Sequence, residues 1–344
     1  MNPLMTSLII SSLALGTIIT LSSHHWLLAW LGLELNTLAI IPLIAEQHHP
    51  RATEAATKYF LTQAAASALL LFASTTNAWL TGTWNIIELS SQPASIMLTM
   101  ALTMKLGLAP LHFWLPEVLQ GTTMKTALII TTWQKLAPLA LLYLTYSTLH
   151  PMTLLTMALL SNIFGGWGGL NQTQTRKIMA FSSIAHLGWM ASILTISPNI
   201  MLLNLMIYIL MTLPTFMLLM ISSAKTIQDL TMTWPTSPMM TSLILVLLMS
   251  MSGLPPLSGF MPKWLILQEL TLHNLTPMAS VMALSALLSL FFYLRLTYVT
   301  TLTLHPTTMQ YEYKWRFFPT LNTTLMTMTF TLSALLLPMT PMFI

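Results

Sequence analysis

The chain is a series of long apolar runs separated by short polar breaks. Most runs are about 20 residues long, the length at which an α-helix crosses the roughly 30 Å hydrocarbon core of a bilayer. The pattern therefore predicts an all-α, polytopic membrane protein with 11 transmembrane helices. The predicted spans run approximately from Pro3 to Leu21, Trp26 to Ile44, Thr57 to Leu80, Ile96 to Leu115, Thr123 to Tyr146, Met152 to Leu170, Ile178 to Ile196, Ile200 to Ser222, Met240 to Leu272, Met278 to Val299 and Thr324 to Phe343.

Composition agrees with this pattern and excludes a soluble fold. Of the 344 residues, 55% are hydrophobic and only 6% are charged, whereas soluble domains carry roughly 25% charged residues. The mean hydropathy is +0.74, and the apolar runs lack the alternation of a transmembrane β-barrel. The longest predicted connections, Ala224 to Met239 and Thr300 to Asn322, are too short for a folded soluble domain. We expect a single transmembrane domain over residues 1–344.

Basic residues gather in the connections on one predicted side of the membrane. These are Arg51, Lys58, Lys125, Arg176, Lys177, Lys225, Lys314 and Arg316, with Arg295 close to the same side. Because positive loops resist translocation, this asymmetry predicts an N-terminus on the inner side and, after eleven crossings, a C-terminus on the outer side. The net charge of +4 is thus loop charge, and no basic patch interleaved with aromatic residues indicates nucleic-acid binding.

An internal repeat interrupts two of the predicted spans. The fourth span contains Gly-Leu-Ala-Pro-Leu-His-Phe-Trp-Leu-Pro-Glu at 107–117, and the ninth contains Gly-Leu-Pro-Pro-Leu-Ser-Gly-Phe-Met-Pro-Lys at 253–263. Glycine and proline break a helix, which lipid tolerates only where the broken segment lines protein or water.

Each copy falls on the fourth helix of a five-helix unit, and because five is odd the two units must cross the membrane in opposite senses. We therefore expect two inverted five-helix repeats, each with a broken fourth helix. They cover about 1–148 and 149–300, and a C-terminal loop and last helix follow at 301–344. Paired broken helices indicate an ion or substrate path.

Four ionisable side chains fall well inside predicted spans: Glu34, Lys105, Lys135 and Lys263. Each costs roughly 2.5–3.5 kcal/mol at a helix centre, so intramembrane charge indicates function by default. Burial disfavours the charged ammonium form of lysine, which favours proton release. These residues are typical of a proton path, and a carboxylate near Lys105 would allow coupled uptake and release. The alternative is static: a Glu34–Lys105 ion pair that locks two helices, with Lys135 and Lys263 bound to carbonyls of the broken helices.

Two histidines are candidate proton relays. His186 lies centrally in the seventh span and His112 lies inside the first repeat motif, and imidazole titrates near neutral pH. For each, a neutral histidine hydrogen-bonded between helices is an equally good interpretation. The chain has no cysteine, so its own thiolates cannot hold an iron-sulfur cluster, and the pattern predicts no cofactor or metal site.

The quoted motifs, together with Leu-Gly-Leu-Glu at 31–34 and Ser-Gly-Leu-Pro-Pro-Leu-Ser-Gly-Phe at 252–260, resemble the antiporter-like membrane subunits of respiratory complex I. The resemblance covers essentially the whole chain and implies an antiporter-like fold. By resemblance, Glu34, Lys105, Lys135 and Lys263 match the family's proton-path residues, and His112 and His186 match intermediates.

The resemblance further implies a multi-pass protein of the mitochondrial inner membrane, with its N-terminus on the matrix side and its C-terminus on the intermembrane-space side. It implies membrane-arm and accessory subunits of complex I, and lipids, as partners. NADH oxidation and ubiquinone reduction, with FMN and iron-sulfur clusters, would belong to those partner subunits, and this chain would not contact NADH. Two other hypotheses remain from the residues themselves: a free-standing cation/proton antiporter and a structural scaffold.

Overall fold

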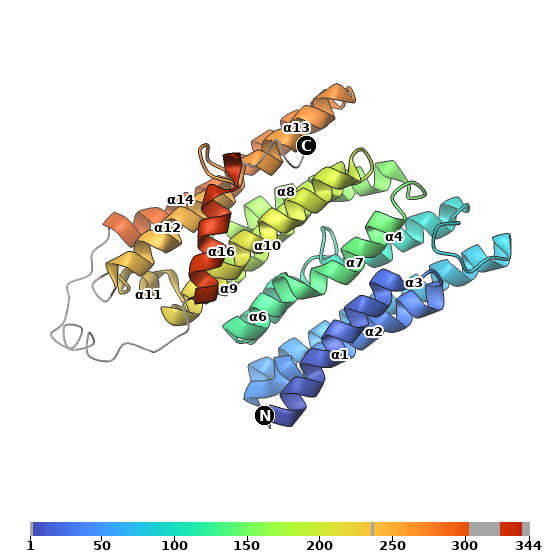
Figure 1. The fold of residues 1–344 in the computed structure, drawn as a ribbon, viewed down its shortest axis with the longest axis horizontal. Helices are drawn as coiled ribbons and strands as arrows, with labels where there is room; N and C mark the ends of the chain where they lie inside the picture. Colours follow the sequence, from blue (N-terminus) through green and yellow to red (C-terminus); the bar gives the residue numbers. More distant parts are fainter. Residues whose placement is uncertain (1–2, 235–236, 303–323, 339–344) are drawn as a thin grey trace. The chain divides into compact units, whose positions relative to one another are not determined.

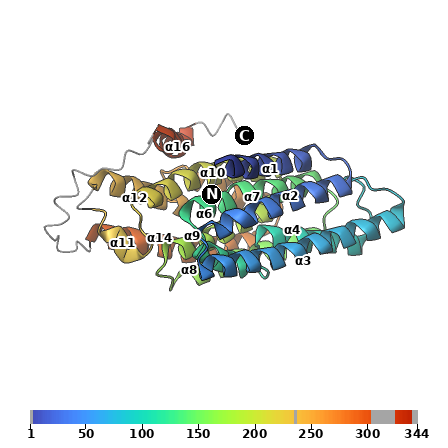
Figure 2. The same ribbon diagram turned by 90° about the horizontal axis from the view of Figure 1, so that it is seen from below.

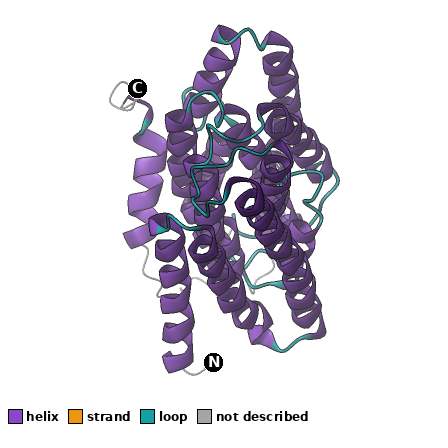
Figure 3. Cartoon of the chain, turned by 90° about the vertical axis from the view of Figure 1, so that its right-hand side faces the viewer, coloured by secondary structure: helices purple, strands orange, loops and turns teal. Residues whose placement is uncertain are grey.

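The computed structural model describes residues 3–234, 237–302 and 324–338. Within these ranges every regular element is a helix, apart from two isolated β-bridges; Figure 3 shows helices joined by short loops. Five helical stretches within the described residues, one of them Met124–Leu144, are long and apolar enough to cross a membrane. The predicted all-α class is therefore confirmed. Lys314, Arg316, most of the Thr300 to Asn322 connection and the end of the eleventh predicted span lie outside the described residues.

The chain divides into two compact units. The first comprises Met1–Ser161 and Met190–Pro198, and the second comprises Asn162–Trp189 and Asn199–Ile344. Each unit is described by itself below.

The first unit is built on three helices, α1 (Pro3–Ser22), α2 (Trp26–Ile44) and α3 (Pro50–Thr81). Helix α2 packs against both α1 and α3 and lies between them (Figures 1 and 2). The approach of α1 to α2 is close because glycines face each other: a Cβ on Gly16 would lie 2.9 Å from the Gly32 carbonyl oxygen. The helices that follow are α4 (Gln92–Leu106), α5 (Trp114–Gly121), α6 (Met124–Thr131), α7 (Trp133–Leu144) and the start of α8 (Pro151–Gly169).

The second unit contains the end of α8 and most of α9 (Thr175–Ile193). Its other helices are α10 (Pro198–Ile221), α11 (Ile227–Thr231), α12 (Pro238–Ser252), α13 (Phe260–Leu272), α14 (Thr276–Leu302) and α16 (Thr324–Leu335). Helix α14 packs against α11, α12 and α13, and α16 packs against α12. The Ser258 hydroxyl donates to the Ser333 carbonyl, which ties the connection after α12 to α16.

The interruptions predicted in the fourth and ninth spans are present. Helix α4 ends before Gly107 and α12 ends before Gly253, whose φ angles of 79° and 83° lie in the left-handed region that favours glycine. The next helices begin at Trp114 and Phe260, so the connections 107–113 and 253–259 are equally long. Each contains a cis X-Pro peptide bond. The two repeat copies match in the length of the connection and in the conformation of the glycine that ends the first half-helix.

The fifth predicted span, Thr123 to Tyr146, is also interrupted, which the sequence pattern did not predict. It forms α6 and α7, separated at Thr132. The Thr131 and Thr132 hydroxyls donate to the Ala127 and Leu128 carbonyls of the preceding turn. Such back-bonding competes with the helical hydrogen bonds and bends a helix.

Within each unit, basic residues gather at one end. In the first unit, a Cβ on Gly121 would lie 2.6 Å from the Arg51 carbonyl oxygen. The start of α3 and the α5–α6 turn that precedes Lys125 therefore lie at the same end of this unit. In the second unit, Thr175 N–H donates to the Lys225 carbonyl at 3.1 Å. Arg295 donates to the Leu170 and Gln172 carbonyls of the α8–α9 loop.

Candidate functional site

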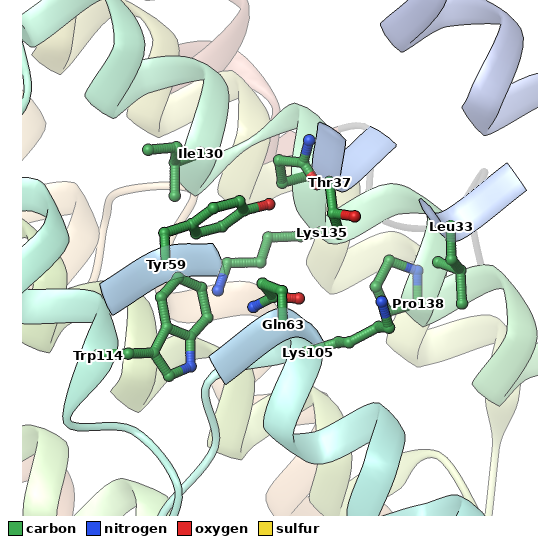
Figure 4. A pocket seen from close by; sticks show the side chains of 10 residues that line it. Leu33, Thr37, Tyr59, Gln63, Lys105, Trp114, Ile130, Lys135 and Pro138 are labelled. Carbon is green, nitrogen blue, oxygen red and sulfur yellow. The ribbon is translucent and has the colours of Figure 1, made fainter. Parts of the chain in front are cut away.

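A small cavity in the first unit lies beside the break between α4 and α5. Its empty space of about 300 Å³ is partly open to the surroundings and leaves room for about one water molecule. Figure 4 shows polar side chains from several helices converging on it. Its lining comprises Leu33, Thr37, Tyr59, Gln63, Lys105, Trp114, Ile130, Gln134, Lys135 and Pro138. The structure thus brings together two of the predicted lysines.

Lys105 lies in the last turn of α4 and is only 5% exposed, and its Nζ has no hydrogen-bond partner. Glu34 on α2 is close enough to act on it electrostatically, and the Glu34 Oε2 atom is also buried without a partner. The two side chains nevertheless form no ion pair, since both ion pairs among the described residues involve Lys58. The static Glu34–Lys105 pair expected under the alternative interpretation is absent here.

Lys135 on α7 is 3% exposed and donates to the Leu106 carbonyl, at the last residue of α4. That carbonyl is available because the helix stops at Gly107, and orphan carbonyls at helix ends need donors. The Lys135 Nζ also lies 5.8 Å from the Trp114 ring centroid, within cation–π range. Trp114 is itself anchored, because its Nε1 donates to the Met104 carbonyl at 3.1 Å.

Two polar residues of α3 that the sequence pattern did not single out also face this cavity. Tyr59 and Gln63 are 1% and 4% exposed, and the Gln63 Nε2 atom has no hydrogen-bond partner. In the view of Figure 4 the Gln63 amide lies between the side chains of Lys105 and Lys135. The available signal was a glutamine inside the apolar third span, but amides also occur as ordinary interhelical contacts.

A second cavity, in the second unit, contains the other predicted lysine. About 180 Å³ of unfilled space is lined by Ser182, Ala185, His186, Trp189, Lys263, Ser289 and Tyr293. Lys263, in the first turn of α13, donates to the Ser252 carbonyl at 2.7 Å and lies 6.0 Å from the Trp189 ring centroid. Ser252 is the last residue of α12, so this lysine also binds the end carbonyl of a broken helix. These two carbonyl contacts are the ones that the static interpretation expected for Lys135 and Lys263.

His186 shares this second cavity with Lys263, which acts on it electrostatically. Its ring lies 5.3 Å from that of Tyr208. His112 lies in the 107–113 connection, is 4% exposed, and packs on Phe113 at 4.4 Å. It does not line either of these cavities. His186 therefore lies in the same cavity as a predicted lysine, whereas His112 lies beside the first helix break.

The side chains that line the two cavities are of kinds that can exchange protons. The lysine nitrogens lie beside helix-end carbonyls, aromatic rings and polar side chains that accept or donate hydrogen bonds. Among residues 3–234, 237–302 and 324–338 no group of three His, Asp or Glu side chains is placed to hold a metal ion. The chain as a whole contains no cysteine.

Two family models match the chain. The model described as NADH:quinone oxidoreductase/Mrp antiporter, TM, matches residues 23–289, and the one described as NADH dehydrogenase subunit 2 C-terminus matches residues 290–344. The NADH-ubiquinone oxidoreductase chain 2 of Varanus timorensis is 58% identical over 344 residues, covering 100% of both chains. That of Xenopus laevis is 56% identical and covers 99% of both.

Solved structures agree with these matches. A chain of respiratory complex I from Thermus thermophilus superimposes with a TM-score of 0.85 at 27% identity, covering 98% of this chain and 80% of that one. A chain of the Mrp complex from Dietzia has a TM-score of 0.77 at 16% identity, covering 87% and 61%, which shows a shared fold. The resemblance inferred from the motifs is confirmed. The chain belongs to the NADH:quinone oxidoreductase/Mrp antiporter family, among the NADH-ubiquinone oxidoreductase chain 2 subunits.

Proposed function

We propose that this chain is a proton-translocating membrane subunit of respiratory complex I in the mitochondrial inner membrane. In this role it couples NADH oxidation and ubiquinone reduction, carried out by other subunits, to proton pumping. The observation that carries the proposal is Lys105, which is buried in a cavity shared with Lys135 and whose Nζ has no hydrogen-bond partner.

The proposed proton path uses Glu34, Lys105, Lys135 and Lys263, with His112 and His186 as relays. In the first unit, Lys105 is buried with no hydrogen-bond partner for its Nζ and shares a cavity with Lys135. In the second unit, Lys263 and His186 line one cavity. A buried ammonium without a partner is costly, so such a group is suited to cycling between charged and neutral forms. A purely structural scaffold would not need it.

Several features of topology belong to the same proposal. They are eleven spans, inverted repeats over about 1–148 and 149–300, a C-terminal loop and helix at 301–344, and an N-terminus on the matrix side. Support comes from the equal form of the two breaks and from the grouping of basic residues at one end of each unit. Positive loops remain on the side from which a membrane protein inserts.

Partners and cofactors follow from membership of the family. The chain acts with other membrane-arm and accessory subunits of complex I, and FMN and iron-sulfur clusters reside in partner subunits. Gentle native extraction followed by mass spectrometry of the co-purifying chains tests this. We expect flavin- and iron-sulfur-binding subunits to accompany the chain. Isolation alone, or only with copies of itself, would favour a free-standing cation/proton antiporter.

Lys105→Met in the assembled complex tests the proton path. Methionine keeps most of the side-chain volume and removes the titrating group, so we expect normal assembly and fewer protons pumped per NADH oxidised. Lys135→Met should give the same result. Lys125→Met is the matched control, because Lys125 is exposed near the basic end of the first unit. An unchanged proton-to-electron ratio in well-assembled Lys105→Met complex would remove Lys105 from the path.

A further inference from the structure

We infer that Gln63 holds a water molecule between Lys105 and Lys135 and is a positioning residue for proton exchange between them. This inference rests on the proposed function of the two lysines. It concerns the α3 wall of the cavity, which lies outside both repeat motifs.

The first argument is the set of unsatisfied polar atoms. Gln63 is 4% exposed and Lys105 is 5% exposed, and both the Gln63 Nε2 and the Lys105 Nζ are buried without a hydrogen-bond partner. Both side chains line the same cavity. Buried N–H groups without acceptors are costly and rare, and in native proteins such groups are usually satisfied by ordered water.

The second argument is the chemistry of the ligand that fits. The two unsatisfied groups are both N–H donors, so a partner that satisfies them must offer an oxygen lone pair. A water oxygen accepts from both donors and keeps two hydrogens to donate. The free space in the first cavity is about that of one water molecule, the least that an ordered water needs. Its lining carries polar atoms on several sides, whereas dry cavities are lined by apolar side chains.

The third argument is the position of Lys135. Its Nζ already donates to the Leu106 carbonyl, so in the neutral amine form its lone pair remains available to accept a proton. Gln63 and both lysines line the same cavity, and in the view of Figure 4 the Gln63 amide lies between them. A water held by Gln63 therefore lies in the space that the two lysines share.

The proton step is balanced without another reactant. An N–H bond of the Lys105 ammonium breaks as an O–H bond forms on the water, and the water's other O–H bond breaks as an N–H bond forms on the Lys135 amine. Lys105 ends neutral, Lys135 ends charged and the water is regenerated. The Gln63 amide neither gains nor loses a proton; it fixes the position of the oxygen.

The test compares Gln63→Leu, Gln63→Asn and a control in the assembled complex. Leucine has a similar size and no hydrogen-bonding group, whereas asparagine keeps the neutral amide N–H on a side chain one methylene shorter. Ser67→Ala is the control: Ser67 lies one turn further along α3, is also buried, and bonds only the Ala64 carbonyl of its own helix.

We expect Gln63→Leu to lower the rate of proton pumping about tenfold, the change that follows from a barrier about 1.4 kcal/mol higher. High-resolution cryo-EM should show a water peak between Gln63 and Lys105 in the wild type and none in Gln63→Leu. Gln63→Asn should retain part of the pumping lost in Gln63→Leu, and Ser67→Ala should change neither the peak nor the pumping.

A dry cavity in the wild-type complex would overturn the inference, as would normal pumping by Gln63→Leu. Equal loss in Gln63→Leu and Ser67→Ala, with the water peak retained in both, would assign the defect to packing of α3 and also overturn it. If Lys105→Met impairs pumping while Gln63→Leu does not, only the role of Gln63 fails. If neither variant impairs it, the proposed proton path fails as well.

Discussion

Lys263 donates a 2.7 Å hydrogen bond to the backbone carbonyl of Ser252, the residue at which α12 stops. Lys135 makes the corresponding contact with Leu106, the residue at which α4 stops. The two acceptors occupy equivalent positions, each directly before the glycine that ends the half-helix. A helix interruption exposes carbonyls that would otherwise bond within the helix, and in both units a lysine uses one of them.

Gly253→Ala tests how closely the break constrains Lys263. The substitution places a Cβ 2.9 Å from Lys263 Cδ and forces a non-glycine residue to a φ of 83°. We expect a stability loss of about 1 kcal/mol from the backbone, together with displacement of the lysine and lower proton pumping. Thermal unfolding and pumping by the assembled complex measure the two effects.

The control for this variant is Gly82→Ala. Gly82 ends α3 with a φ of 75°, and a Cβ there would meet no atom within 4 Å. It therefore carries the same backbone cost without touching a lysine. Equal loss of pumping in both variants would contradict a specific role for the Gly253–Lys263 contact.

Glu34→Gln tests the electrostatic coupling to Lys105. Glutamine preserves the shape of the side chain but removes the charge that acts on Lys105. We expect the complex to assemble and to pump fewer protons per NADH, because the charged form of Lys105 loses its support. Normal pumping with lower thermal stability would instead make Glu34 a contact between helices. Glu46→Gln, outside α2, is the matched control.

Asp229→Ala tests the capping box of α11, in a connection outside the predicted spans. The Asp229 carboxylate accepts from Lys225 N–H at 3.0 Å and from Thr226 N–H at 2.8 Å. Burial works to raise the pKa of Asp229, but these bonds and the Thr226 hydroxyl outweigh it and lower the pKa below 3.8. We expect a local loss of about 0.5–1 kcal/mol, seen as faster amide hydrogen exchange at 225–229, with Gln228→Ala as control.

The pH dependence of this cap has a definite sign. Because the native pKa is lowered, the stabilisation is fully present above pH 3.8 and is lost as the pH falls through the lower native value. Exchange protection at Lys225 and Thr226 in the wild type should therefore be constant near neutral pH, after correction for intrinsic exchange. A loss of that protection between pH 6 and 7 would show that another group controls this loop.

The sequence by itself determined the class of the protein, its helix breaks and its buried charges. A run of about 20 apolar residues has few alternatives to a membrane helix. Gly107 and Gly253 end their helices through their own backbone conformation. Both features are therefore set by residues within one segment of the chain. Charged residues inside such runs can likewise be identified from the sequence of one segment. The family motifs lie in these local segments, and the membership they predicted was confirmed over the whole chain.

Only the tertiary structure decided which groups meet. Lys135 donates to a carbonyl 29 residues earlier in the chain. Gln63 lines the same cavity from a different helix. Glu34 forms no ion pair with Lys105. The interruption at Thr132 was likewise not evident. Such contacts depend on the rotation and spacing of packed helices, which many distant side chains set together, whereas spans and breaks follow from the residues within one segment.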